Sequence, residues 1–173
     1  MIYNDESKVL FFKLNPDAVI PSKRVIDAGY DVYSCFTDDY LVVYPNTCEK
    51  IKTGIASVMS DRYCMILKER SSVGSKNTSL VASVIDSGYR GEWLVAISNH
   101  NDIPFVIAKA YVSDDVIKSE LGIKEFIRYP YEKAITQGLL VEVPKVEIKE
   151  INKDEFELYT TERGVGGFGS SKK

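Results

Sequence analysis

The chain has 173 residues, 45% of them apolar and 27% charged, with a formal net charge of −3. This length predicts one domain with a substantial core, and the small acidic charge gives no reason to expect nucleic acid or a membrane surface as a partner. No segment approaches the roughly 18 apolar residues of a membrane span. Residues 9–12 form an apolar run after Asp5 and Glu6, which is too short and has the wrong charge order for a signal peptide.

The cysteines and the single histidine narrow the chemistry. Cys35, Cys48 and Cys64 are odd in number and widely spaced, with no CxxC pair, so we expect reduced core thiols in the cytoplasm of a cell, or of a host if the source is a phage or virus. His100 follows a predicted strand and is expected at the surface. One histidine is too few for a zinc site or a Ser–His–Asp triad.

Short β-strands are predicted along most of the chain. The candidate runs are rich in Val, Ile, Tyr and Phe, and turn residues separate many of them. Many short strands at close spacing favour an all-β sandwich, jelly roll or barrel. The predicted strands cover residues 8–14, 30–35, 40–44, 49–58, 63–68, 80–85, 92–98, 104–110 and 139–143.

One helix and one arm complete the predicted organisation. Ser113 can cap a short helix that must stop by Gly122, within a segment at 110–131. The end of the chain is glycine-rich around a single aromatic, so it has too little apolar surface to fold alone and should be mobile until something orders it. We therefore expect a domain over residues 1–158 and a flexible arm over residues 159–173.

Residues 80–85 and 93–97 are predicted to form a β-hairpin, with turn residues between them. Unpaired backbone groups at its tip can match the edge of a flat heterocycle. Asp86 ends the first strand, so its carboxylate can face a cleft and hold a water, and Tyr89 is an aromatic wall beyond the turn. Gly91 suits a bulge or a close backbone approach. The alternative is an ordinary surface hairpin with an Asx-type turn.

Three further stretches carry groups suited to phosphates and metal ions. Asp31, after a glycine turn, could bind a hydrated cation or be a turn carboxylate. Arg70, Ser71 and Ser72 follow a strand and offer a planar donor fork, hydroxyls and backbone N–H groups suited to phosphate oxygens. Gln137 can donate to a phosphate oxygen or contact a metal-bound water. Each stretch alone is weak, because such loops are common.

The last stretch, residues 163–171, is Arg-Gly-Val-Gly-Gly-Phe-Gly-Ser-Ser. A bare glycine-rich tail is usually a linker. Here an arginine, an aromatic and hydroxyl groups make an arm that could close over a nucleotide. Arg163 would take a phosphate, and Phe168 would stack on a base.

These five stretches, in this order and at comparable spacing, resemble the five motifs of the trimeric deoxyuridine triphosphatase (dUTPase) family. The matching sequences are Asp-Ala-Gly-Tyr-Asp at 27–31, Arg-Ser-Ser at 70–72, Val-Ile-Asp-Ser-Gly-Tyr-Arg-Gly at 84–91, and Arg-Gly-Val-Gly-Gly-Phe-Gly-Ser at 163–170. The likeness covers roughly residues 27–171. It implies a jelly-roll (β-clip) protomer in a homotrimer with three sites at subunit junctions, which hydrolyses dUTP to dUMP and pyrophosphate by water attack at the α-phosphorus. That reaction keeps uracil out of DNA and supplies dUMP for dTMP synthesis.

The resemblance also implies residue roles. Asp86 would activate the water and hold the 3′-hydroxyl, and Tyr89 would pack on the deoxyribose. Backbone groups would read the uracil edge around Val84, Ile85 and Gly91. The phosphates would be held by Arg70, Ser71, Ser72, Gln137, Arg163, Gly169 and Ser170. Phe168 would lie over the uracil. Asp31 and Gln137 would contact waters on a Mg²⁺ ion bound mainly by the triphosphate.

Three departures from the family pattern affect details. Around the fourth motif, Tyr131 replaces a usual glycine and the spacing to Gln137 is one residue longer, which leaves Glu132 and Lys133 without assigned roles. Ser83 replaces a frequent glycine before the third motif. The 110–131 segment is longer than in compact members, and we expect it to cover the site rim or to contact a protein partner.

Two alternative functions compete with this interpretation. A dCTP deaminase shares similar motifs but needs a glutamate on the strand after the hairpin, where this chain has Ala96. A jelly-roll nucleotide-binding regulator without turnover would not need the base Asp86.

Overall fold

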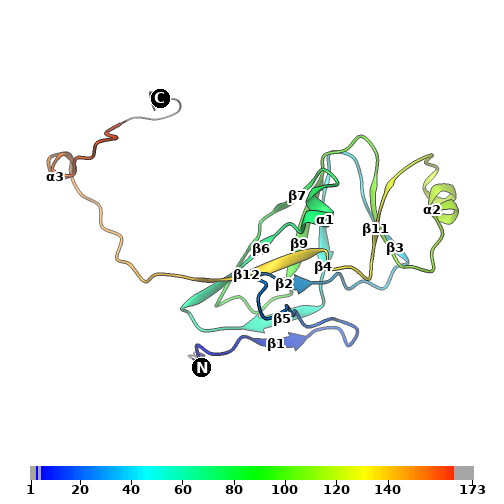
Figure 1. Ribbon diagram of the computed structural model, residues 1–173, viewed down its shortest axis with the longest axis horizontal. Coiled ribbons are helices and arrows are strands. Elements are labelled where there is room, and N and C mark those ends of the chain that lie inside the picture. Colours follow the sequence, from blue (N-terminus) through cyan, green and yellow to red (C-terminus); the bar gives the residue numbers. More distant parts are fainter. Residues whose placement is uncertain (1–2, 4, 166–173) are drawn as a thin grey trace.

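The structure is a computed structural model that describes Tyr3 and residues 5–165 (Figure 1). Its described part is mainly β-structure, as predicted. The strands are β1 (Leu10–Lys13), β2 (Tyr30–Val32), β3 (Tyr40–Val43), β4 (Cys48–Lys52), β5 (Ile55–Val58), β6 (Tyr63–Lys68), β7 (Thr78–Val81), β8 (Val84–Asp86), β9 (Leu94–Asn99), β10 (Phe105–Ala108), β11 (Ile127–Pro130) and β12 (Thr136–Glu142). The helices are α1 (Ser71–Gly74), α2 (Asp114–Leu121) and α3 (Lys153–Glu157).

These strands form small sheets whose order crosses the chain repeatedly. The described sheets have the orders β1-β5, β11-β10-β3, β2-β12-β6-β8 and β4-β9-β7. All pairs are antiparallel except β10 with β11, which run parallel. The predicted all-β jelly-roll class is confirmed.

One buried cluster holds the sheets together around Trp93. Its indole N–H donates to the Ser57 hydroxyl at 3.1 Å, and its ring meets Phe11 edge-on at 5.3 Å between centroids. The Thr53 hydroxyl donates to the Trp93 carbonyl at 2.6 Å. The indole N–H and the Trp93 carbonyl therefore both have hydrogen-bond partners. Burying this large side chain leaves no polar group unpaired, so it carries no penalty for an unsatisfied donor or acceptor.

The predicted strand at 49–58 is two strands, and the break has a clear cause. Gly54 lies between β4 and β5 with φ +69°, and a Cβ there would lie 2.9 Å from the Ala18 side chain. Only glycine tolerates both the left-handed backbone and this close approach.

The predicted hairpin is correct at its base and wrong at its tip. Strands β7 and β9 pair as expected, with Val81 opposite Ala96. The chain then turns sharply at Ala82, which has φ 57°. Strand β8 leaves the hairpin and pairs with β6 instead, with Ile85 opposite Met65. The two arms are therefore splayed near the tip, and a cavity opens between them.

The 110–131 segment contains the predicted helix and a strand that the sequence did not indicate. The Ser113 side chain caps α2 by accepting from the Val116 N–H, and Gly122 ends the helix with φ 65°. Helix α2 connects the parallel strands β10 and β11, and its buried Ile117 packs against Val106. The short helices α1 and α3 were also not predicted as helices.

The predictions for thiols and histidine are mostly confirmed. Cys35 and Cys64 are buried free thiols, but Cys48 is exposed, so its placement in the core was wrong. It begins β4, an amphipathic strand whose Ile51 alone is fully buried. His100 is exposed after β9, as expected. Among the helices within the described ranges, none is long and apolar enough to cross a membrane.

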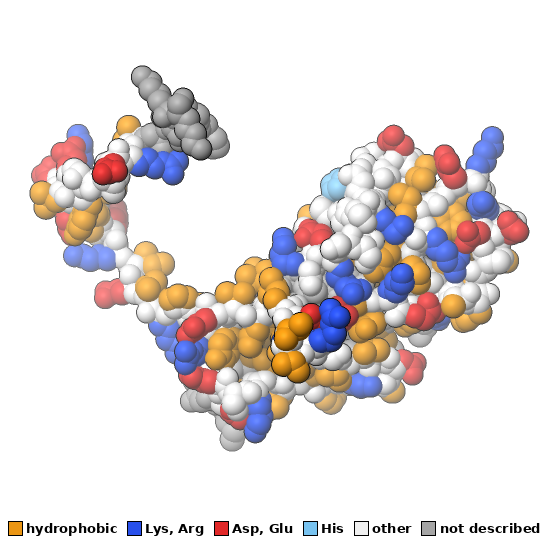
Figure 2. Space-filling model, viewed as in Figure 1, with side chains coloured by type: hydrophobic (Ala, Val, Ile, Leu, Met, Phe, Trp, Pro, Cys, Tyr) orange, Lys and Arg blue, Asp and Glu red, His pale blue; other side chains and the backbone are white. Residues whose placement is uncertain are grey.

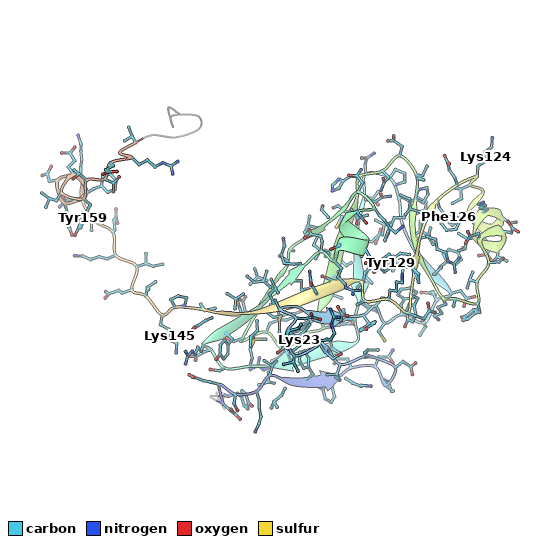
Figure 3. The ribbon with its side chains drawn as sticks, in the orientation of Figure 1. Lys23, Lys124, Phe126, Tyr129, Lys145 and Tyr159 are labelled. Atoms are coloured by element: carbon cyan, nitrogen blue, oxygen red, sulfur yellow. The ribbon has the colours of Figure 1, made fainter. Side chains whose placement is uncertain are left out.

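Beyond β12 the chain leaves the body of the molecule (Figure 1). The Val143 N–H donates to the Arg62 carbonyl at 2.7 Å, and Lys145 pairs with Asp61 at 2.7 Å. The segment then extends away, and Figure 3 shows Tyr159 far from the sheets. Its exposed apolar side chains are Val146, Ile148, Phe156, Leu158, Tyr159 and Val165.

Candidate functional site

Three of the five predicted motifs meet because strand β12 lies between β2 and β6. Gln137 on β12 is opposite Asp31 on β2 and opposite Lys68 on β6. Directly opposed residues in a sheet stand about 5 Å apart, so this register alone gathers side chains that are far apart in sequence. We call the resulting group the cradle: Asp31, Arg70, Ser71, Ser72 and Gln137.

Arg70 is the central cation of the cradle. It is extended at the end of β6 and directly precedes α1. Its Nε lies 3.1 Å from Asp31 Oδ1, and its Nη1 donates to the Ala134 carbonyl at 3.1 Å. These two contacts fix the planar guanidinium, and its remaining N–H donors are available for phosphate oxygens.

Gln137 is also fixed, with one end of its amide kept available. Its Nε2 donates to the Glu69 carbonyl at 3.0 Å, which leaves Oε1 as an acceptor. A Cβ at Gly29 would lie 2.4 Å from that Oε1, so only glycine allows this close approach. The Glu69 carboxylate in turn accepts from the Leu80 N–H at 2.9 Å, and this bond lowers the pKa of Glu69.

The two serines of the cradle belong to α1. The Ser72 hydroxyl lies 3.1 Å from the Tyr129 hydroxyl, which donates to the Ala134 carbonyl at 2.7 Å. Ser71 is exposed. Tyr129 was not predicted as part of the site, and it comes from β11 in the 110–131 segment. No local pattern marks it, because its contact with Ser72 joins residues 57 positions apart.

The cradle forms one side of a large cavity of about 1010 Å³, which the loop at 22–29 also lines. This loop brings Lys23 and Arg24, and Arg24 is held by two hydrogen bonds to Asp27 at 2.7 and 3.1 Å. Figure 2 shows charged and hydrophobic side chains gathered on this face, where Figure 3 labels Lys23. The cavity lining thus carries three basic and two acidic side chains besides its hydroxyl groups, a net positive charge that suits a polyanion.

A second cavity, of about 260 Å³, lies between the splayed arms β8 and β9; we call it the base cavity. It is lined by Lys50, Ala82, Val84, Ile85, Asp86, Tyr89, Glu92, Leu94 and Ala96. Asp86 ends β8 and is exposed, as predicted. Across the described residues, its carboxylate has no hydrogen-bond or ion-pair partner. An exposed carboxylate without a partner can accept a proton from water or a hydrogen bond from a sugar hydroxyl.

Tyr89 forms a wall of the base cavity, and Gly91 allows its position. The Tyr89 hydroxyl donates to the Glu92 carbonyl at 3.1 Å. A Cβ at Gly91 would lie 2.4 Å from that hydroxyl. Gly91 itself does not line the cavity, so in this chain its visible role is to let the tyrosine ring fold back.

The chain does not bring its two groups of site residues together. The base cavity and the cradle cavity share no lining residue. Asp86 lies opposite Cys64 at one end of β6, whereas Gln137 lies opposite Lys68 at the other end. Four residues of strand separate these positions by about 13 Å.

The described residues of the fifth motif belong to neither cavity. Arg163 lies beyond α3, on the segment that extends from the body (Figure 1). Phe168, Gly169 and Ser170 lie outside the described residues.

Comparisons with known proteins show which family this jelly-roll chain belongs to. A family model described as dUTPase matches residues 16–111. The deoxyuridine 5′-triphosphate nucleotidohydrolase of Nautilia profundicola is 31% identical over 170 residues, which cover 96% of this chain and 99% of the relative. The deoxyuridine 5′-triphosphate nucleotidohydrolase of Clostridioides difficile is 30% identical over 163 residues, which cover 92% of this chain and 94% of the relative. The chain therefore belongs to the dUTPase family, and the predicted dUTP diphosphatase activity is confirmed.

Solved structures of phage dUTPases share the fold. A point mutant of the Staphylococcus bacteriophage 80alpha dUTPase with dUpNHpp has a TM-score of 0.73 at 24% identity, and the match covers 95% of this chain and 98% of that chain. A mutant dUTPase from phage phi11 of S. aureus, described with a coordinated structural Mg(II) ion, has a TM-score of 0.67 at 24% identity, with 86% and 99% covered. At this identity the likeness supports the jelly-roll fold.

Proposed function

We propose that the chain hydrolyses dUTP to dUMP and pyrophosphate by attack of water at the α-phosphorus, with Asp86 as the general base. The observation that carries this proposal is the partner-free Asp86 carboxylate in the base cavity, beside Tyr89. Asp86 would also hold the 3′-hydroxyl, and Tyr89 would pack on the deoxyribose. The reaction would supply dUMP for dTMP synthesis and keep uracil out of DNA.

The cradle would hold the triphosphate. Phosphoanhydride cleavage needs a placed water, a base, and donors aimed at the developing charge. Arg70, held by Asp31 and by the Ala134 carbonyl, supplies pre-oriented donors. Ser71 and Ser72 add hydroxyls. Uracil would be read by backbone groups around Val84, Ile85 and Gly91, close to where β8 and β9 separate after the turn at Ala82.

The active site would form between copies of the chain in a homotrimer. Asp86 and Arg70 of one chain line two separate cavities with no lining residue in common, which favours a site that takes its base-binding side from one copy and its phosphate-binding side from the next. A head-to-tail interface that closes into a ring would place the base cavity of one copy against the cradle of the next. Val25 and Ile26, which are 95% and 92% exposed beside the cradle, offer an apolar surface for such a neighbour.

The C-terminal arm would complete the site of another copy. In residues 145–150 apolar and charged residues alternate, which is typical of a strand, yet Val146 and Ile148 are 74% and 94% exposed and pair with no strand of the described body. This segment could therefore carry Arg163, Phe168, Gly169 and Ser170 to a neighbouring site, where Phe168 would cover the uracil.

Mg²⁺ would be the cofactor, held mainly by the substrate. Within the part of the chain that the structure describes, no group of three or more acidic, histidine or cysteine side chains could hold a metal ion. The cradle offers the Asp31 carboxylate and the Gln137 Oε1, and these fit contacts to metal-bound waters rather than direct coordination. When bound, the ion neutralises phosphate charge.

The 110–131 insertion would serve a protein partner, while its Tyr129 contacts Ser72 of the cradle. None of its residues lines either cavity.

A cytoplasmic location would suit the nucleotide substrate.

Mixed trimers test the shared site. Asp86→Asn and Arg70→Gln would each inactivate a homotrimer, because one lacks the base and the other the phosphate donor. When the two proteins are refolded together, some sites combine an intact Asp86 with an intact Arg70 from a neighbour. Random mixing should restore about a quarter of wild-type pyrophosphate release, measured with light scattering for mass. No recovery in trimers of verified mixed composition would contradict the shared site.

A deaminase is disfavoured by the base cavity itself. Ala96 lines this cavity, so the position that would need a proton-transferring glutamate holds only a methyl group. A panel of nucleotides with product identification separates the two reactions: pyrophosphate from dUTP is expected, and robust ammonia release from dCTP would overturn the assignment.

A further inference from the structure

The base cavity contains one cation that the proposed mechanism does not use. Lys50 on β4 lies opposite Ala96 on β9, so the two side chains share one face of the sheet. Both line the base cavity, together with Asp86 and Tyr89. Lys52, two residues along the same strand and on the same face, does not line it.

Nothing within the described residues neutralises Lys50. Its ammonium has no hydrogen-bond or ion-pair partner there, and the Asp86 carboxylate forms no ion pair with it. The other acid of the cavity, Glu92, already accepts from the Gly54 N–H at 2.8 Å. The small Ala96 leaves space beside the flexible lysine stem, so the ammonium can reach a ligand in the cavity.

We propose that Lys50 is a specificity-determining residue that donates a hydrogen bond to the carbonyl oxygen at position 4 of the pyrimidine. This rests on the proposed function, in which the base cavity receives the base. An ammonium has three donors and no acceptor. Uracil presents an acceptor at position 4, whereas cytosine presents an amino donor there, so the same lysine attracts one base and leaves the other unpaired.

The test compares Lys50→Met with Lys52→Met. Methionine keeps much of the stem and removes the donors, and Lys52 provides the same change on the same strand outside the cavity. We expect the ratio of kcat/KM for dUTP to that for dCTP to fall about 10- to 100-fold in Lys50→Met, the usual range for losing a charge-assisted hydrogen bond, and to stay unchanged in Lys52→Met. Lys50→Gln should also lower the ratio, because its amide can donate or accept.

Inhibition by dUMP and dCMP gives a second measurement that needs no turnover of dCTP. Lys50→Met should weaken inhibition by dUMP much more than inhibition by dCMP. Ratios within twofold of wild type in both assays would overturn the proposal. A shift of the acidic limb of the pH–rate profile to higher pH without loss of selectivity would also overturn it, since Lys50 would then act by favouring the charged form of Asp86. Failure of the wild-type protein to release pyrophosphate from dUTP would instead overturn the proposed function.

Discussion

The cradle and the base cavity are built in opposite ways. In the cradle three polar side chains are held by residues from other parts of the chain: Arg70 by Asp31, Gln137 by the Glu69 carbonyl, and Ser72 by Tyr129. In the base cavity, Asp86 and Lys50 have no such partner among the described residues. The cradle is thus arranged before a ligand arrives, whereas the base cavity presents reactive groups that only a ligand or a neighbouring copy would satisfy.

This difference suits the two tasks. Donors for a triphosphate are most effective when they are fixed in advance, because no energy is then spent on reorienting them during the reaction. A general base, in contrast, must stay free of strong partners to accept a proton from water. Variants that disturb one region at a time separate these two tasks, and they differ in how much activity or stability they should cost.

Removing the C-terminal arm should have the largest effect. It would leave the cradle and the base cavity intact, but both would be open to solvent. A chain truncated before Arg163 loses the proposed clamp over phosphates and uracil, so water is no longer excluded from the site. We expect loss of pyrophosphate release without unfolding, checked by an activity assay, circular dichroism and light scattering. Wild-type activity in the truncated chain would refute the role of the arm.

Asp86→Asn tests the base cavity alone. The amide keeps the shape of the side chain but cannot take the proton, so the rate should fall by about 10²–10⁴-fold, the usual range for a general base. Binding of dUpNHpp, measured by calorimetry, should be retained. Asp61→Asn is a matched control, because Asp61 pairs with Lys145 and lines neither cavity. A rate within tenfold of wild type for Asp86→Asn would contradict the role of this carboxylate.

Gly29→Ala tests the cradle. The new Cβ would lie 2.4 Å from Gln137 Oε1 and must push that side chain off the Glu69 carbonyl. Losing one oriented hydrogen bond should lower kcat/KM for dUTP about tenfold. Gly74→Ala is the control, because its Cβ would meet nothing closer than 3.7 Å. Equal kinetics for the two variants would indicate that Gln137 does not act on the substrate.

The sequence predicted some elements with correct bounds and missed others that depend on tertiary contacts. Strand β6 and helix α2 were predicted with the correct bounds, because each carries a clear pattern: a continuous β-rich run, and a capped helix ended by glycine. The turn at Ala82 was not predictable, since alanine gives no signal for a left-handed backbone and the choice of β6 over β9 as partner is a tertiary effect. Tyr129 was missed for the same reason.

Tyr129→Phe should affect stability more than turnover. The hydroxyl is buried, donates to the Ala134 carbonyl and contacts Ser72, so its loss should cost about 1–2 kcal/mol of unfolding free energy. Arg70 also donates to that carbonyl, which keeps it paired and limits the kinetic effect to a few-fold. Urea unfolding should show no comparable loss for Tyr111→Phe, an exposed tyrosine bonded to Asp39. Equal losses would show that the buried hydroxyl has no special role.

A small effect on stability is expected from the hydrogen bond between the Leu80 N–H of β7 and the Glu69 carboxylate beside the cradle. The Leu80 N–H holds the pKa of Glu69 below its ordinary value of 4.5, so the folded state favours the charged carboxylate. The resulting stability is fully present above that value and is lost as the pH falls through the lower pKa of the folded state. Glu69→Gln lacks this titration, so the stability difference between wild type and variant in urea unfolding should shrink as the solution is made more acidic than pH 4.5. A difference that stays constant across this range would mean that the Leu80 bond does not depend on the charge of Glu69.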